Sequence, residues 1–80
     1  MIEKPLADMA PGEEGEIIAL EGGEKLKSRL RALGLAKGQR IRNMSRIGWG
    51  GPLVVLVNRA QIAIGRGTAR KILVRVEGDE

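Results

Sequence analysis

The sequence predicts a small, mostly β protein, an antiparallel β-barrel with one α-helix inserted after the first strand and a short helical turn before the last strand. Two observations predict this class. Short aliphatic runs alternate with tight, glycine-rich turns, as is typical of small barrels. A single segment has the apolar spacing of an amphipathic helix. With 80 residues and no cysteine, we expect one domain spanning 1–80, stabilised by an aliphatic core without disulfides.

In the N-terminal part of the sequence we predict a short irregular segment, here called the lead-in, followed by the first strand. Leu6–Gly12 is the lead-in, and its Pro11-Gly12 pair predicts a turn. Gly15–Leu20 is predicted as the first strand, because it contains β-branched residues and is bounded by glycines.

A helix is predicted from Glu24, because leucines recur there at i, i+4 and i+7 and form one apolar stripe. Gly34 stands where a left-handed residue ends a helix, and Leu35 would then fold back on Leu30 in a Schellman motif. The cations that flank and oppose the stripe are Lys25, Lys27, Arg29 and Arg31. The stripe itself is Leu26, Leu30 and Leu33, which we expect to pack against Ile17, Val55, Ile62 and Val74.

A long basic strand is predicted over Gln39–Ile47. Its three arginines share parity, so they should line one face; they are Arg40, Arg42 and Arg46. The alternation is imperfect, because Asn43 shares the parity of Ile41.

The rest of the chain predicts three shorter strands. Gly48–Pro52 is suited to a hairpin connection, and Leu53–Val57 is apolar on both parities, which implies that both of its faces are covered. Asn58-Arg59 then turns the chain into Ala60–Ile64. After a break at Gly65–Gly67, a short helical turn is predicted over Thr68–Lys71. The last strand is predicted over Ile72–Val76, with its alternate residues Ile72, Val74 and Val76 inward.

Charge is segregated along the chain. Residues 1–24 carry seven acids and one lysine, whereas residues 25–75 carry thirteen Lys and Arg and no acid. Two arrangements are open. A free basic face would bind phosphates, an anionic membrane surface or an acidic protein. Alternatively, the acidic first strand pairs with basic neighbours and cancels the field.

The side-chain inventory argues against an enzyme. The chain has no Cys and no His, which removes thiol nucleophiles, imidazole bases and the usual zinc ligands. Gly65–Arg70 lacks the third glycine of a dinucleotide-binding loop. Three carboxylates could hold a hard cation, but acids in a turn entering a strand commonly face solvent; they are Glu13, Glu14 and Glu16. We therefore expect no catalytic, cofactor-binding or metal-binding residues.

Trp49 is the only aromatic residue and lies between glycines at the predicted hairpin tip. Trp is enriched at interface hot spots, so Trp49 is a candidate partner-binding residue. In the alternative arrangement the indole lies along the barrel edge, over an arginine stem. The full partner-binding hypothesis comprises Trp49, Arg40, Arg42 and Arg46.

The expected location is the cytoplasm. Met1–Pro5 lacks the basic and apolar regions of a signal peptide. The longest aliphatic run, Leu53–Val57, is far too short to span a bilayer.

Taken in order, several segments match the pattern of one family. They are Leu6–Gly15, Leu20–Gly23, Leu30–Gly38, Gly50–Val55, Gln61–Ile64 and Ala69–Val74. On these residues the chain resembles the FeoA family, small cytosolic accessory proteins of bacterial ferrous iron uptake. The resemblance runs from about Leu6 to Val76. Two positions depart from the family pattern: Asn58-Arg59 lacks the frequent glycine, and Asn43 replaces an apolar residue.

The resemblance implies an SH3-like β-barrel and a role beside the ferrous iron permease, whose cytosolic G domain would be the partner. The same domain closes iron-dependent repressors of the diphtheria-toxin-repressor type, but a chain of 80 residues favours the transporter accessory. Family members with His or Cys can bind zinc or iron. This chain has neither, so metal binding is not carried over.

We therefore expect a non-enzymatic binding module of a ferrous iron uptake system. One alternative is a small nucleic-acid-binding barrel that uses Arg40, Arg42, Arg46 and Arg66 on phosphates. That alternative is disfavoured because one aromatic residue cannot stack successive bases. A carrier of Fe²⁺ on the acidic turn is a third alternative. Formation of a homo-oligomer is left open.

Overall fold

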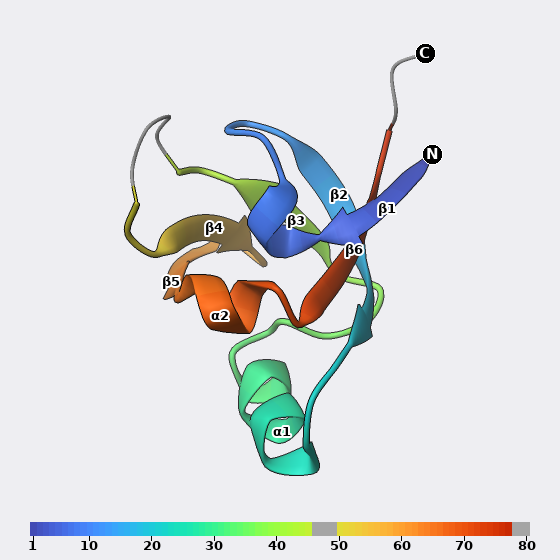
Figure 1. Cartoon of the computed structure of the whole chain (residues 1–80), viewed down its shortest axis with the longest axis vertical. Helices are drawn as coiled ribbons and strands as arrows, with labels where there is room; N and C mark the ends of the chain where they lie inside the picture. Colours follow the sequence, from blue (N-terminus) through green and yellow to red (C-terminus); the bar gives the residue numbers. More distant parts are fainter. Residues whose placement is uncertain (46–49, 78–80) are drawn as a thin grey trace.

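The structure, a computed structural model, describes residues 1–45 and 50–77 (Figure 1). Within these ranges six strands form one antiparallel sheet: β1 (Ile2–Pro5), β2 (Glu14–Leu20), β3 (Arg40–Asn43), β4 (Leu53–Val57), β5 (Ala60–Ile64) and β6 (Ile72–Val76). The helical elements are the 3₁₀ turn η1 (Leu6–Asp8), α1 (Glu24–Ala32) and α2 (Arg66–Ala69). The mostly β, antiparallel prediction is confirmed.

The strand order is β1-β6-β2-β3-β4-β5. The last described strand therefore lies between the first two, with Ile2 opposite Val76 and Gly15 opposite Val76 on the other side. In the described part of the chain, no strand pairing joins β1 to β5, so hydrogen bonds leave the sheet open between these edges.

Strand β1 is a feature that the sequence prediction did not contain. Strand β1 precedes the predicted lead-in. The turn η1 follows β1 directly, and its first residue, Leu6, is completely buried. The sequence of β1, Ile-Glu-Lys-Pro, has no apolar alternation, and only the pairing with β6 makes it a strand. Pro5 is tolerated because β1 is an edge strand with no second neighbour among the described residues.

Helix α1 begins at Glu24 and ends in the predicted Schellman motif. Gly34 has a φ of 93°. The Leu35 N–H donates to the Leu30 oxygen at 2.9 Å, and the Gly34 N–H donates to the Arg31 oxygen at 3.0 Å. These two bonds satisfy carbonyls that the helix end would otherwise leave free.

The predicted leucine stripe is only partly correct. Leu30 is buried and Leu26 half-buried, but Leu33 is 50% exposed, so its assignment to the core was wrong. The reason is that α1 stands clear of the sheet (Figure 1). The chain packs back through Leu35, which is completely buried. The core contains the predicted Ile17, Val55 and Val74, whereas Ile62 is half-buried at its margin.

Strand β3 is shorter than predicted, because strand structure ends at Asn43. Beyond it, the Met44 N–H still donates to the Val54 oxygen at 2.7 Å, but the Val54 N–H is taken by the Ser45 hydroxyl oxygen at 2.9 Å. A side chain thus replaces the backbone acceptor and the regular ladder stops. The remainder of the predicted strand, Arg46 and Ile47, lies outside the described residues.

The last three strands have the predicted bounds. Asn58 and Arg59 have φ values of 53° and 68°, the left-handed pair of a tight two-residue hairpin. The outward residues of β4 are only half-buried, so full cover of both faces was wrong. The helical turn also starts earlier than predicted, at Arg66, because the Gly65 oxygen accepts the Ala69 N–H at 2.9 Å.

Candidate functional site

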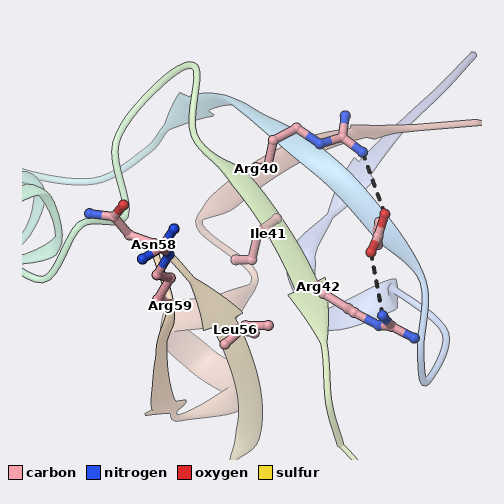
Figure 2. Close-up of a pocket in the computed structure, with 7 residues that line it drawn as sticks. Arg40, Ile41, Arg42, Leu56, Asn58 and Arg59 are labelled. Carbon is pink, nitrogen blue, oxygen red and sulfur yellow. Dashed lines mark hydrogen bonds and ion pairs between the residues drawn. The ribbon is translucent and has the colours of Figure 1, made fainter.

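The exposed face of β3 carries Arg40 and Arg42, as their parity predicted. Both form ion pairs with the Glu14 carboxylate of β2, drawn as dashed lines in Figure 2. A nitrogen of Arg40 lies 3.8 Å from Glu14 Oε1, and a nitrogen of Arg42 lies 3.5 Å from Oε2. The strand register explains this, because Glu14 pairs with Arg42 and Glu16 pairs with Arg40. One carboxylate therefore bridges the two arginines and partly neutralises them.

The same alternation of charge continues toward the other edge of the sheet. Glu3 of β1 lies opposite Arg75 of β6, with an ion pair of 3.1 Å. Glu16 lies between Arg75 and Arg40 in the register. The acidic strand thus pairs with basic neighbours, which is the second of the two arrangements that the sequence left open. Such exposed pairs add little stability, but they cancel the field of a basic sheet face.

A shallow hollow of about 290 Å³ lies over β3 and β4. It is lined by Glu14, Arg40, Ile41, Arg42, Leu56, Asn58 and Arg59. Figure 2 shows Arg40 and Arg42 turned toward the carboxylate, while Asn58 and Arg59 come from the β4–β5 turn on the other side. The hollow combines cationic groups with one carboxylate, that of Glu14, which is already ion-paired with Arg40 and Arg42.

The carboxylates of the acidic turn before β2 do not converge on one point, because Glu13 and Glu14 have different partners. Glu13 accepts the Ala10 N–H at 2.8 Å and lies 2.9 Å from the Lys4 ammonium. The Ala10 hydrogen bond, with help from Lys4 and against partial desolvation, lowers the pKa of Glu13. Glu14 is held by the arginines instead. Over residues 1–45 and 50–77, no three Asp, Glu, His or Cys side chains are grouped to hold a metal ion.

Asn43 is a structural residue whose role the sequence signalled only through its parity. It is 2% exposed on the inner face of β3. Its Nδ2 donates to the Met9 oxygen at 2.8 Å, and its Oδ1 accepts the Ser45 N–H at 2.9 Å. Its backbone also pairs with Gly12 and Glu13. Asn43 therefore ties the lead-in to the sheet.

Helix α1 presents a second charged surface that the partner-binding hypothesis did not include. Four cations lie on it, and in the described structure one of them, Arg31, forms an ion pair, at 3.2 Å with Glu24. The signal was present in the sequence, since cations occupy every second position from Lys25 to Arg31. Neither α1 nor α2, the helices of the described ranges, has the length and apolar character needed to cross a bilayer.

Two members of the partner-binding hypothesis, Trp49 and Arg46, lie outside the described residues. Their placement relative to Arg40 and Arg42 stays a prediction. Arg66, invoked for phosphate contact, is half-buried at the start of α2 and is already engaged in an interaction.

Comparison with known proteins points to one family. The model of the FeoA domain matches residues 4–76. The crystal structure of an iron uptake regulatory protein (FeoA) is similar with a TM-score of 0.84 and 31% identity, over 94% of this chain and 97% of that one. The solution structure of FeoA from Chlorobium tepidum has a TM-score of 0.84 and 26% identity, over 95% and 73% of the two chains.

A third structure extends the likeness in fold. FeoA from Stenotrophomonas maltophilia, determined with zinc and described as a procaryotic SH3 domain protein, has a TM-score of 0.78 and 23% identity, over 89% of this chain and 88% of that one. No curated protein sequence matches the chain.

Proposed function

The chain belongs to the FeoA family, and from that membership we propose that it is a non-enzymatic accessory module of a ferrous iron uptake system. It would act in the cytoplasm by contacting the cytosolic G domain of the iron permease. The observation that carries this proposal is the family match over residues 4–76. The similarity to an iron uptake regulatory protein over nearly the full length of both chains supports it.

The site geometry favours binding over chemistry. The described side chains form ion pairs, a buried hydrogen bond from the Asn43 amide to the Met9 oxygen, and an open hollow. They do not form a paired general acid and general base. Contact with a protein needs only a surface of complementary shape and charge. The nucleic-acid alternative loses support, because Glu14 already binds Arg40 and Arg42, two of its phosphate contacts.

We also propose that the sheet curves into an SH3-like barrel and that the chain unfolds as one domain. The contact between η1, which follows the β1 edge, and α2, which follows the β5 edge, supports closure by packing rather than by strand pairing. Nuclear Overhauser contacts between Leu6 and Ala69 methyl groups, together with a single cooperative transition, would be the expected observations.

The functional test is binding to the isolated G domain of a ferrous iron permease, measured by calorimetry. We expect a saturable complex with that domain. A single-stranded oligonucleotide should bind only weakly and lose its affinity steeply as salt rises. Tight oligonucleotide binding at physiological salt, with no G-domain complex, would overturn the proposal.

A further inference from the structure

The cations of the chain divide into those that have a carboxylate partner and those that do not. On the sheet, each of Lys4, Arg40, Arg42 and Arg75 has an ion pair. On α1, in the described structure, Lys25, Lys27 and Arg29 have none. Three cations without an ion pair therefore lie close together on one short helix, whereas the other described cations without one, Lys37, Arg59, Arg70 and Lys71, lie outside it.

Two of these unpaired cations share a column with an exposed leucine. Lys25, Arg29 and Leu33 are spaced four residues apart, so they lie above one another along the helix. Leu33 is 50% exposed at the helix end. A further exposed cation, Lys71, lies beside the start of the helix, because a Cβ placed on Gly22 would lie 3.5 Å from the Lys71 Cδ.

The helix is free to meet another surface. It stands away from the sheet at one end of the molecule (Figure 1). Its attachment is through Leu30, which is buried, and through the half-buried Leu26. The column of Lys25, Arg29 and Leu33 lies on exposed flanks of the helix.

We propose that this basic column docks on an anionic lipid bilayer. The ammonium and guanidinium groups of Lys25, Arg29 and Lys71 bind lipid phosphates, and Leu33 enters the interface between headgroups and acyl chains. Long cationic side chains suit this position, because their stems are apolar and their tips are charged. The net charge of +4 attracts the molecule to an anionic surface.

A bilayer fits this surface better than an acidic protein does. The nine residues of α1 span only about 13 Å. A specific protein interface needs about 800 Å² on each partner. The hollow described above is lined by residues of β2, β3, β4 and the β4–β5 turn and by none of α1. Attraction to an anionic bilayer depends on the number of cations near the surface and needs no shaped groove.

The test is flotation of the protein with vesicles of phosphatidylcholine alone and of an equal mixture with phosphatidylglycerol. We expect binding to the anionic vesicles only, weakening as salt rises. Lys25→Gln with Arg29→Gln should lower the partition coefficient about 30-fold, since each cation near the surface contributes roughly fivefold. Leu33→Ser should also lower it, at unchanged net charge.

The matched control is Arg40→Gln with Arg42→Gln, which removes the same two charges from the sheet. We expect the control to bind the anionic vesicles nearly as well as the unmodified chain. Circular dichroism should show that both double variants remain folded, since all four side chains are exposed.

Three results would overturn the proposal. The chain could ignore anionic vesicles, or the two double variants could lose binding equally, which would be a general charge effect. Inorganic phosphate could also compete fully with the vesicles at the lipid phosphate concentration, which would identify a soluble-anion site. If the unmodified chain does not bind vesicles and the variant Lys25→Gln with Arg29→Gln loses binding to the G domain, the column of Lys25, Arg29 and Leu33 contacts a protein partner instead. Because the vesicles contain no protein, a negative result here leaves the permease proposal untouched.

Discussion

The side-chain amide of Asn43 donates a 2.8 Å hydrogen bond to the backbone oxygen of Met9, which lies 34 residues earlier in the chain. Both residues are buried. The bond therefore has no water to replace it, and the lead-in and β3 are joined at a point where apolar packing alone would leave a carbonyl unsatisfied.

Asn43→Ala should destabilise the protein by about 1–3 kcal/mol, because the Met9 oxygen and the Ser45 N–H would lose their buried partner. Chemical denaturation measures this change. Gln61→Ala removes an exposed amide on β5 and is the control, with a change within about 0.5 kcal/mol. Equal losses of unfolding free energy in both variants would contradict a stabilising role for the hydrogen bond between Asn43 and Met9.

Leu30→Ala should cost about 2–5 kcal/mol, which is most of the stability of a domain of this size. Leu33→Ala should cost far less, because Leu33 is 50% exposed. Thermal melts of the two variants separate the buried leucine from the exposed one. A Leu30 variant that melts within a degree or two of the unmodified chain would show that α1 does not pack on the core.

Gly15→Ala should destabilise the sheet by roughly 1–3 kcal/mol through overpacking. A Cβ at this position would lie 2.7 Å from the Arg75 oxygen and 2.8 Å from Val76 Cγ1. Gly67→Ala is the matched control, because a Cβ there meets nothing within 4 Å and alanine favours helix. The control should be neutral or slightly stabilising in urea denaturation.

Acidification should weaken the turn before β2 through Glu13. The Ala10 N–H and Lys4 lower the pKa of Glu13 in the folded chain. Its contribution is therefore present above the ordinary glutamate pKa and is lost as pH falls through the lowered folded value. Glu13→Gln should flatten this acid-side loss in a series of melts. An unchanged slope in the variant would mean that other carboxylates carry the effect.

Trp49→Ala should leave the fold intact and weaken the complex with the permease G domain by about 2 kcal/mol or more, as for an interface hot spot. As the only tryptophan, it can be followed by fluorescence. Red-shifted, readily quenched emission from the free protein is expected. Blue-shifted, protected emission would instead support an indole packed along the barrel edge.

Local signals predicted the parts of this structure that local interactions determine. The Gly34-Leu35 pair predicted the end of α1, and Asn58-Arg59 predicted the hairpin, because each depends on the conformation of two adjacent residues. Strand β1 was missed, since it exists only through residues about seventy positions away.

The candidate site shows the same limit. Parity placed Arg40 and Arg42 on one exposed face correctly. Their neutralisation by Glu14 could not be predicted, because it depends on the register between β2 and β3. The exposure of Leu33 was not predicted either. The spacing of the leucines predicts which residues share one face of the helix, but it does not predict how closely that face packs on the sheet.

The position of β6 between β1 and β2 has a consequence for synthesis on the ribosome. Until Val76 has emerged from the exit tunnel, neither of the first two strands has the neighbour that lies between them in the finished sheet. The β4–β5 hairpin depends on residues that are neighbours in sequence, whereas the sheet cannot be completed before β6 is available. Completion of the sheet is therefore expected to be slow compared with formation of its local turns, because it depends on pairings between residues far apart in sequence.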